Sequence, residues 1–242
     1  MEVWIGCCGF CESQQKYFQD FKTIEIQKTF YQLINKNLAK KWRERAPENF
    51  IFNLKVFQGI THPSSSPTWK RANIDVEKIK EKVGFLKPSV EVLEFWEKQL
   101  EIAKILKARV LVLQLPKSFR DEKENWRNAK KFFSKINRNN FLIGVELRSW
   151  KEESRKKFCK KFEVIDVVDP FATKPQYLTK ENVAYFRLHG SPPGKRMYSY
   201  KYTKKDLGKL KEFVEETGAK EVFVMFNNIF MKENALAFSK ML

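Results

Sequence analysis

The sequence predicts an α/β protein folded as a single (β/α)8 TIM barrel over residues 1–242. Eight short runs rich in β-branched and aromatic residues recur along the chain, and longer amphipathic stretches separate most of them. With 242 residues, of which 43% are hydrophobic and 14% aromatic, the chain can bury one large core. An open doubly wound sheet is the alternative that the same alternation allows.

The eight runs are expected to be strands because each is short and rich in β-branched and aromatic residues. They cover residues 3–9, 23–27, 50–56, 109–115, 141–147, 163–169, 183–190 and 221–228. Amphipathic helices are expected where apolar residues recur at helical spacing, with charged residues elsewhere. They cover residues 38–46, 89–108, 120–136, 151–162, 203–218 and 232–242.

Two connections make the predicted barrel somewhat irregular. The helical segment between the first two strands is short, and "QGITHPSSSPTWKRANI" (58–74) forms a long loop after strand 3. Long ordered loops usually form lids or rims of functional sites. We therefore expect this loop to border any site at the barrel mouth.

The charge of the chain is strongly positive. Lys and Arg number 47 against 29 Asp and Glu, which gives a net charge of +18. Such a field favours a polyanionic partner, either nucleic acid or a phosphorylated ligand. Lysine-rich surfaces that only maintain solubility, as in thermophiles, are the alternative, but they explain the high charge better than its imbalance.

The chain shows no sign of membrane insertion. No run of about 18 apolar residues occurs, and "MEVWIGCCGF" lacks the basic and apolar regions of a secretion signal. We expect a soluble, cytoplasmic protein without a membrane partner.

Three of the four cysteines are crowded into "GCCGFC", as Cys7, Cys8 and Cys11, and Cys159 is distant. The spacing does not favour an iron–sulfur centre, since adjacent residues of a strand point to opposite faces. A redox pair of Cys8 and Cys11 and buried, unreactive thiols both stay open.

Polar residues gather at the ends of seven successive predicted strands. In a barrel these ends meet at one mouth, and a buried polar group without partners costs about 1–3 kcal/mol there. The pattern therefore favours a site, although ion pairs such as Glu146 with Arg187 are also expected. The residues are Glu25, Gln27, Lys55, Gln114, Glu146, Arg148, Asp169, Arg187, His189, Asn227 and Asn228.

Both histidines of the chain are expected at this mouth. Arg187 and His189 are two positions apart and therefore face the same side of their strand. Arg187 suits a carboxylate or phosphate, and His189 suits proton transfer or metal binding. His62, in the loop after strand 3, is expected to reach over the same mouth.

The leading functional prediction is a nuclease-like enzyme that cleaves phosphodiesters with a divalent metal, Mg²⁺ or Mn²⁺. In this hypothesis the metal ligands come from Glu25, Glu146, Asp169 and His189, while Lys55 and Arg187 neutralise the phosphate and Tyr31 or Trp69 stacks on a base. The candidate catalytic residues are Glu25, Glu146, Asp169, His189 and Lys55. The candidate substrate-binding residues are Tyr31, His62, Gln114, Arg148, Arg187, Asn227 and Asn228.

Two alternatives stay open. A metal-independent enzyme could hold a small phosphorylated or carboxylated metabolite with Arg148 and Arg187, and transfer a proton through His189 or Glu146. In a variant of this scheme a desolvated Lys55 forms a Schiff base. Alternatively, a non-catalytic nucleic-acid-binding protein would use its lysine-rich helices.

Several motifs together resemble one known family. They are "GCCGF", "TIEIQKTFYQL", "FNLKVFQGITH", "LQLPKSF", "VELRSW", "FRLHGS", "MYSYKY" and "MFNN…ENALAF". Their order and their spread over nearly the whole chain resemble the domain of unknown function 72 family, also called YecE-like.

The resemblance implies a TIM barrel with a polar pocket at its mouth and no settled reaction. It marks Glu25, Thr29, Tyr31, Lys55, His62, Gln114, Glu146, Arg148, Asp169, Arg187, His189, Asn227 and Asn228 as motif positions. The first motif of the family commonly reads Gly-Thr-Ser-Gly-Trp, whereas this chain has Gly6, Cys7, Cys8, Gly9 and Phe10. The thiols are therefore a feature of this chain.

Overall fold

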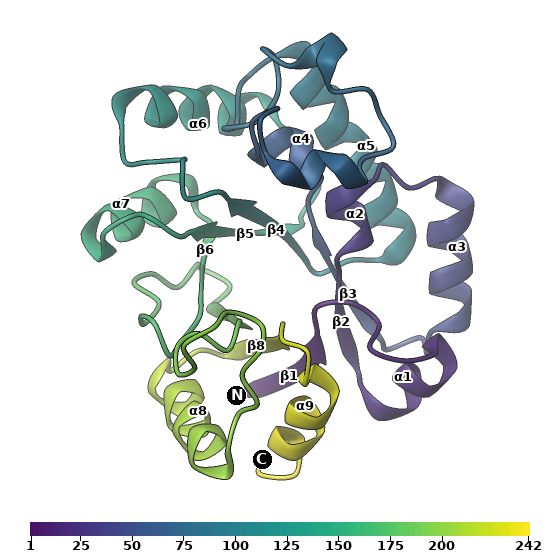
Figure 1. Cartoon of the computed structure of the whole chain (residues 1–242), viewed down its shortest axis with the longest axis vertical. Coiled ribbons are helices and arrows are strands. Elements are labelled where there is room, and N and C mark those ends of the chain that lie inside the picture. The colour runs from purple at the N-terminus through teal and green to yellow at the C-terminus, as the bar shows by residue number, and fades with distance from the viewer.

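The computed structural model, which describes residues 1–242, is a closed barrel of parallel strands arranged in chain order (Figure 1). Six residue pairs join β8 to β1, from Glu2 with Glu221 to Cys7 with Phe226, and close the barrel. The predicted TIM barrel is thus confirmed, and the open-sheet alternative is wrong. The strands are β1 (Glu2–Cys7), β2 (Thr23–Ile26), β3 (Ile51–Lys55), β4 (Val110–Leu115), β5 (Leu142–Leu147), β6 (Ile165–Val168), β7 (Val183–Leu188) and β8 (Glu221–Phe226).

Helices surround the strands (Figure 1). Each predicted helix is present with ends shifted by a few residues, and the first connection holds only the short α1, as expected. The helices are α1 (Gln14–Asp20), α2 (Lys28–Tyr31), α3 (Lys36–Arg45), α4 (Gln58–Thr61), α5 (Val90–Leu106), α6 (Lys123–Lys135), α7 (Glu152–Phe162), α8 (Lys204–Glu216) and α9 (Met231–Ser239), with 3₁₀ turns η1 (Pro67–Arg71) and η2 (Glu77–Ile79). None of them has the length and apolar character needed to cross a bilayer.

Local sequence signals fix several helix starts. The Ser89 side chain accepts a hydrogen bond from the Val92 N–H at the start of α5, and Asn35 does the same for α3. At the start of α8, Thr203 and Asp206 form a reciprocal capping box. The connection from β6 to β7, residues 169–182, has no helix, so the barrel is irregular there as well as after β3.

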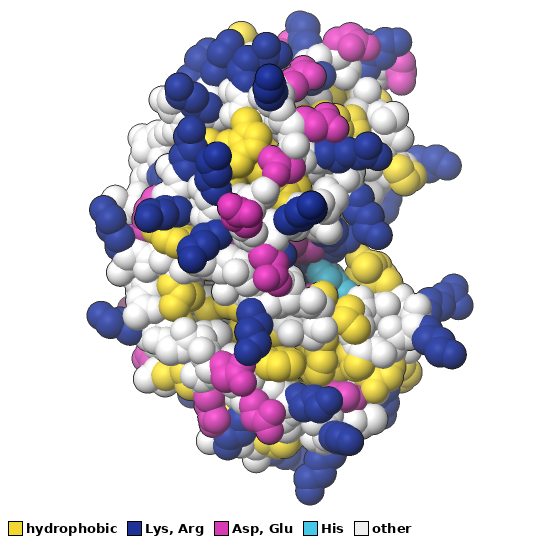
Figure 2. Space-filling view, turned by 90° about the vertical axis from the view of Figure 1, so that its left-hand side faces the viewer, with side chains coloured by type: hydrophobic (Ala, Val, Ile, Leu, Met, Phe, Trp, Pro, Cys, Tyr) yellow, Lys and Arg dark blue, Asp and Glu magenta, His cyan; other side chains and the backbone are white.

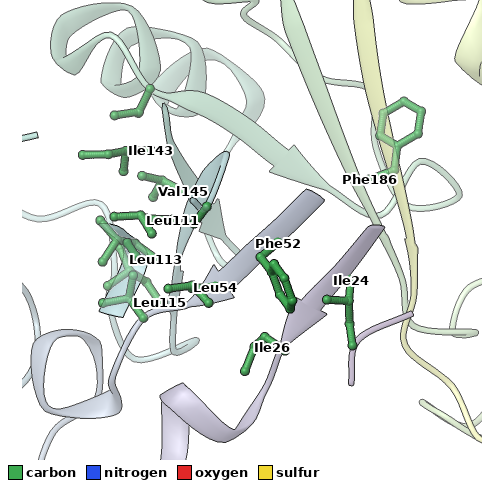
Figure 3. Close-up of a cluster of buried hydrophobic side chains, with 14 of the residues drawn as sticks. Ile24, Ile26, Phe52, Leu54, Leu111, Leu113, Leu115, Ile143, Val145 and Phe186 are labelled. Carbon is green, nitrogen blue, oxygen red and sulfur yellow. The ribbon is translucent and has the colours of Figure 1, made fainter. Parts of the chain in front are cut away.

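The main core lies between the strands and the helices. Figure 3 shows part of it, where Ile24, Phe52, Leu54 and Leu111 come from neighbouring strands. These positions alternate with residues that face the barrel axis, because side chains of a strand point alternately to its two faces. The outer face is therefore apolar along most of each strand.

The barrel interior changes character along its axis. A second apolar cluster, which includes Val112, Val167, Tyr185 and Phe223, fills the part of the interior farther from the carboxyl ends of the strands. The inward positions nearer the carboxyl ends of the strands are polar or charged instead. They include Glu25, Lys55, Gln114, Glu146 and Arg187, all of them buried. The barrel interior is therefore charged near the carboxyl ends of the strands and apolar below them.

Two segments rise on opposite sides of this charged end: the connection from β3 to α5, at the top of Figure 1, and the loop from β7 to α8, toward the bottom. Figure 2 shows a notch in the molecular outline, with a histidine at its base and Lys and Arg side chains on both sides. The mouth is therefore an indented region bordered by cations.

Candidate functional site

Arg187 is the centre of the buried polar network in the barrel. Its side chain is fully buried and donates to Glu25 twice, from Nε to Oε2 over 3.0 Å and from Nη2 to Oε1 over 2.9 Å. Nη1 also bonds Glu146 and, over 3.2 Å, the Gln114 Oε1 atom. This fork geometry suits two carboxylates from different strands, so the network joins β2, β4, β5 and β7 across the barrel.

Glu146 joins this network to the barrel mouth. One carboxylate oxygen accepts from Arg187, and the other accepts from Arg148 and lies 3.4 Å from His189 Nε2. Burial alone would raise the pKa of Glu146, but the attraction of Arg148 and Arg187 outweighs it and holds the pKa well below its usual value. Glu146 is thus an ionised partner of two guanidinium groups.

His189 is held from three sides. Asn227 Nδ2 lies 3.1 Å from His189 Nδ1, Arg148 Nη2 lies 3.3 Å from Nε2, and the ring meets Tyr198 edge-on at 5.7 Å. Burial lowers the pKa of His189 even though Glu146 opposes this effect. The imidazole is therefore neutral near pH 7 and can accept or donate a hydrogen bond.

Lys55 is a buried amine that makes no ion pair. Its Nζ lies 3.7 Å from the centroid of the Phe30 ring, and the residue is 6% exposed. Burial and then repulsion by Arg187 lower the pKa of Lys55 from 10.5 to about 7. A substantial fraction of this amine is therefore neutral and nucleophilic at physiological pH.

Asp169 is the second group that titrates near neutrality. Its Oδ2 accepts from the His189 backbone N–H over 2.9 Å, and its Oδ1 accepts from the Phe171 N–H over 3.1 Å. Burial raises the pKa of Asp169 to about 7 although both bonds oppose the rise. The carboxyl group is thus fixed in orientation, and both its protonated and its ionised form are populated near pH 7.

A cavity of about 300 Å³ opens beside these groups at the carboxyl ends of β5, β6 and β7. Asp169, Glu146, His189, Arg148 and Lys117 are among its lining residues. Arg148 is partly accessible, with 18% of its side chain exposed, and Lys117 is exposed. The cavity therefore combines a titratable carboxyl group with two accessible cations.

The expected metal site is not assembled. Glu25, Glu146, Asp169 and His189 do not make up a group of three or more side chains that could hold a metal ion, and no other such group occurs. The physical reason is that Arg187 lies between the two glutamates, while backbone N–H groups hold both oxygens of Asp169.

Other predicted residues lie near the mouth without facing the cavity. His62 is buried, bonds Thr61 Oγ1 over 2.8 Å and meets Phe30 edge-on at 4.9 Å. Burial and the nearby Lys55 lower the pKa of His62 to about 3, so it stays neutral. Tyr31 is half-buried beneath the Arg71 guanidinium, 3.5 Å from the ring centroid.

Two predicted residues turn away from the site. Asn228 donates to Tyr200 O over 2.7 Å and to Asn234 Oδ1 over 2.9 Å, so it supports the loop before α8. Trp69 is buried and donates to Pro63 O over 2.9 Å, which leaves no ring face for a base.

Sequence reasoning missed several members of the site. Tyr185 donates to Glu25 Oε2 over 3.0 Å, and its place two residues before Arg187 was the signal for it. Cys8 lies in the barrel with Sγ 4.0 Å from Arg187 Nη2. Lys117 stands in "LQLPKSF", a motif whose resemblance to the family assigns the lysine no role. Thr173, Ser191 and Met197 come from loops and carried no signal.

Several solved structures share the fold of this chain over nearly its full length. A DUF72 family protein from Enterococcus faecalis V583 is 24% identical and has a TM-score of 0.74, with 99% of this chain and 97% of that chain covered. A DUF72 family protein from Thermotoga maritima MSB8 is 22% identical with a TM-score of 0.68, over 100% and 99% of the two chains. D-psicose 3-epimerase shares the fold at 12% identity and a TM-score of 0.61, over 100% and 98%.

No curated protein matches the chain. The family model described as "Protein of unknown function DUF72" matches residues 12–242, a range that includes every site residue from Glu25 to Asn227. With this match over nearly its full length, the chain belongs to the DUF72 family.

Proposed function

We propose that the barrel mouth is the active site of a metal-independent enzyme that binds a small carboxylated or phosphorylated metabolite and transfers a proton. One observation carries this proposal: Asp169, with a pKa of about 7, lines a 300 Å³ cavity together with Arg148 and Lys117. A general acid or base works best when its pKa lies near the operating pH.

The cations supply the binding part of this function. Arg148 is tethered through Nε to Glu146 and approaches His189 through Nη2, so its position is fixed before a ligand enters. A pre-positioned guanidinium binds carboxylate or phosphate with little loss of side-chain entropy. Lys117, exposed at the edge of the cavity, adds a second positive charge.

The same contacts lend less support to metal-assisted phosphodiester cleavage. That reaction needs carboxylates free to bind a cation, whereas Glu25 and Glu146 are both bound to Arg187. The cavity size also suits a small metabolite better than a polymer, because ligand pockets of about 300–1,000 Å³ bury small molecules.

The experiment is solvent isotope exchange. The protein is incubated in D₂O with sugar phosphates and 2-oxo carboxylates, and loss of carbon-bound protons is followed by NMR. We expect exchange in at least one compound class, loss of exchange in Asp169→Asn, and a raised KM in Lys117→Met. Lys98→Met, an exposed lysine of α5, is the matched control.

Two outcomes would overturn the proposal. One is exchange that survives intact in Asp169→Asn. The other is cleavage of labelled DNA or RNA that requires Mg²⁺ or Mn²⁺ and disappears in Glu146→Gln, because that result would restore the nuclease hypothesis.

A second chemistry at the same mouth is favoured by Lys55. An unpaired amine with a pKa of about 7 can attack a carbonyl carbon and form a Schiff base. Borohydride treatment in the presence of an oxo acid would trap the adduct, and peptide mass spectrometry would locate it. Trapping on Lys55 supports this chemistry, whereas adducts spread over exposed lysines, or unchanged in Lys55→Met, contradict it.

Nucleic acid as a partner is favoured by charge alone. The net charge is +18, and Lys and Arg side chains are spread over the face in Figure 2, including both sides of the notch. Binding of this kind weakens steeply with salt. Titration of labelled single-stranded RNA between low and physiological salt tests it, and weak, salt-independent binding would argue against it.

A further inference from the structure

Two thiols at the end of β1 lie close together outside the Arg187 network. Cys7 is the last residue of β1 and is fully buried, and Cys11 lies in the loop that leads to α1 and is half-buried. Their Sγ atoms are 3.9 Å apart. All four cysteines are free thiols.

Alternation along β1 selects Cys7 rather than Cys8 as the partner of Cys11. Cys8 belongs to the cluster inside the barrel and approaches Arg187, whereas Cys7 belongs to the core outside it. Cys11 packs against that outer core too. A pair of Cys8 and Cys11, which the sequence left open, would have to reach across the strand, so the structure replaces it with Cys7 and Cys11.

We propose that Cys7 and Cys11 are a redox-active dithiol that a peroxide oxidises to an intramolecular disulfide. In the first step the Cys11 thiolate attacks one peroxide oxygen, the O–O bond breaks, and Cys11 becomes a sulfenic acid while the other oxygen leaves as water or an alcohol. In the second step the Cys7 sulfur attacks the Cys11 sulfur, and the sulfenic oxygen leaves as water. Two thiols are oxidised and one peroxide is reduced.

The two thiols differ in the way these steps require. Cys11 is the accessible one, and its hydrogen bond with Cys7 lowers its pKa although partial burial opposes this. Burial raises the pKa of Cys7 well above its ordinary value. Cys11 is therefore the thiol that meets the peroxide, and Cys7 is the resolving thiol.

Closing the bond has to bring the two sulfur atoms closer together. A disulfide needs its sulfur atoms about 2.05 Å apart, compared with 3.9 Å here. Cys7 is fixed in β1, where its N–H donates to Tyr17 Oη over 2.9 Å, so the Cys11 side is the one that shifts. Gly9, with φ of 110°, lies between them and gives the loop a flexible point.

The loop that carries Cys11 lies next to the Arg187 network. A Cβ atom on Gly9 would lie 3.7 Å from Gln27 Cγ, and the Gln27 amide bonds Glu25, a direct partner of Arg187. Cys8, the residue between Cys7 and Gly9, approaches Arg187 itself. Cys7 is therefore adjacent in sequence to Cys8, which contacts the buried Arg187 network.

The experiment treats the full-length reduced protein with hydrogen peroxide and follows intact mass and disulfide-linked peptides. We expect loss of two hydrogens, a linked peptide pair of Cys7 and Cys11, and reversal by dithiothreitol. In Cys7→Ser the resolving thiol is gone, so dimedone should label a sulfenic acid on Cys11. In Cys11→Ser neither the disulfide nor the label should form.

Cys8→Ser and Cys159→Ser are the matched controls, and both should still form the disulfide. A Cys8–Cys11 link, a disulfide between two chains, or oxygen addition to Cys11 in the wild-type protein without any link would overturn the proposal. Far-UV circular dichroism of each variant separates these outcomes from loss of folding.

Discussion

Replacing Arg187 by Met tests the central feature of the barrel. The change keeps a long apolar stem but removes the guanidinium that bonds Glu25, Glu146 and Gln114. Glu146 keeps Arg148, whereas Glu25 keeps only the Tyr185 hydroxyl and the Gln27 amide as partners. One carboxylate is thus left buried without a cation.

The expected cost follows from that unpaired charge. Removing one partner of a buried ion pair destabilises a protein by about 3–5 kcal/mol. For a chain of this size each kcal/mol lowers Tm by about 2–4 °C, so we expect a drop of roughly 6–20 °C. Urea denaturation of both proteins at pH 7, followed by circular dichroism, measures the free energy of unfolding directly.

The pH dependence has a defined sign. Because the folded-state pKa of Glu146 is held well below 4.5, its contribution to stability is present above pH 4.5 and is lost as the pH falls below that value. The difference in the free energy of unfolding between the wild type and Arg187→Met should therefore become smaller as the pH falls below 4.5.

A double variant makes the reasoning refutable. Adding Glu25→Gln to Arg187→Met removes the unpaired charge and should restore part of the lost stability. A loss below about 1 kcal/mol in the single variant, or a double variant less stable than the single one, would mean that the network does not hold the barrel together in this way.

Three further substitutions test a buried amine and two glycines with different surroundings. Because burial lowers the pKa of Lys55 from 10.5 to about 7, its contribution to stability is present above pH 10.5 and is lost as the pH falls to 7. The free energy of unfolding of the wild type, relative to that of Lys55→Met, should therefore rise between pH 7 and 10 in urea titrations. A Cβ atom on Gly6 would lie 2.3 Å from Thr23 O, so Gly6→Ala should cost about 3 kcal/mol or more. Gly208 in α8 has free space around it, so Gly208→Ala should gain up to about 1 kcal/mol, and equal effects of the two alanines on Tm would contradict both expectations.

The barrel could be predicted because its determinants are local. Strand runs and helix periodicity follow from burial of one face, and their alternation leaves few topologies. The polar strand ends could be predicted for the same reason, since inward positions near the carboxyl ends cannot bear charge without partners. The ion pair of Glu146 with Arg187 also follows from the sequence, since both residues stand at predicted strand ends, and the structure contains it.

The pairing of groups across the barrel could not be predicted in full. Whether Glu25 and Glu146 accept from Arg187 or hold a metal depends on side-chain positions that only the closed barrel fixes. The same limit explains Trp69, whose burial depends on how the loop after β3 folds back. Asn228 follows the same limit, because it lies beyond the end of β8 and its direction depends on its bonds to Tyr200 and Asn234.

The balance of charges at the mouth predicts how ligand binding responds to pH. Arg187 and Arg148 are matched by Glu25 and Glu146, so the net charge of the site depends on the two groups that titrate near neutrality. As the pH falls from 8 to 6, Lys55 gains a positive charge and Asp169 loses a negative one. Both changes favour an anion.

Sulfate is a suitable probe, because its charge stays constant over this range. We expect calorimetry to show affinity increasing toward pH 6, by at most about tenfold per pH unit for each proton taken up with the anion. Asp169→Asn and Lys55→Met should each remove part of the dependence, since each fixes one of the two charges. Affinity that is constant or stronger at pH 8 would show that these two groups do not control the field at the mouth.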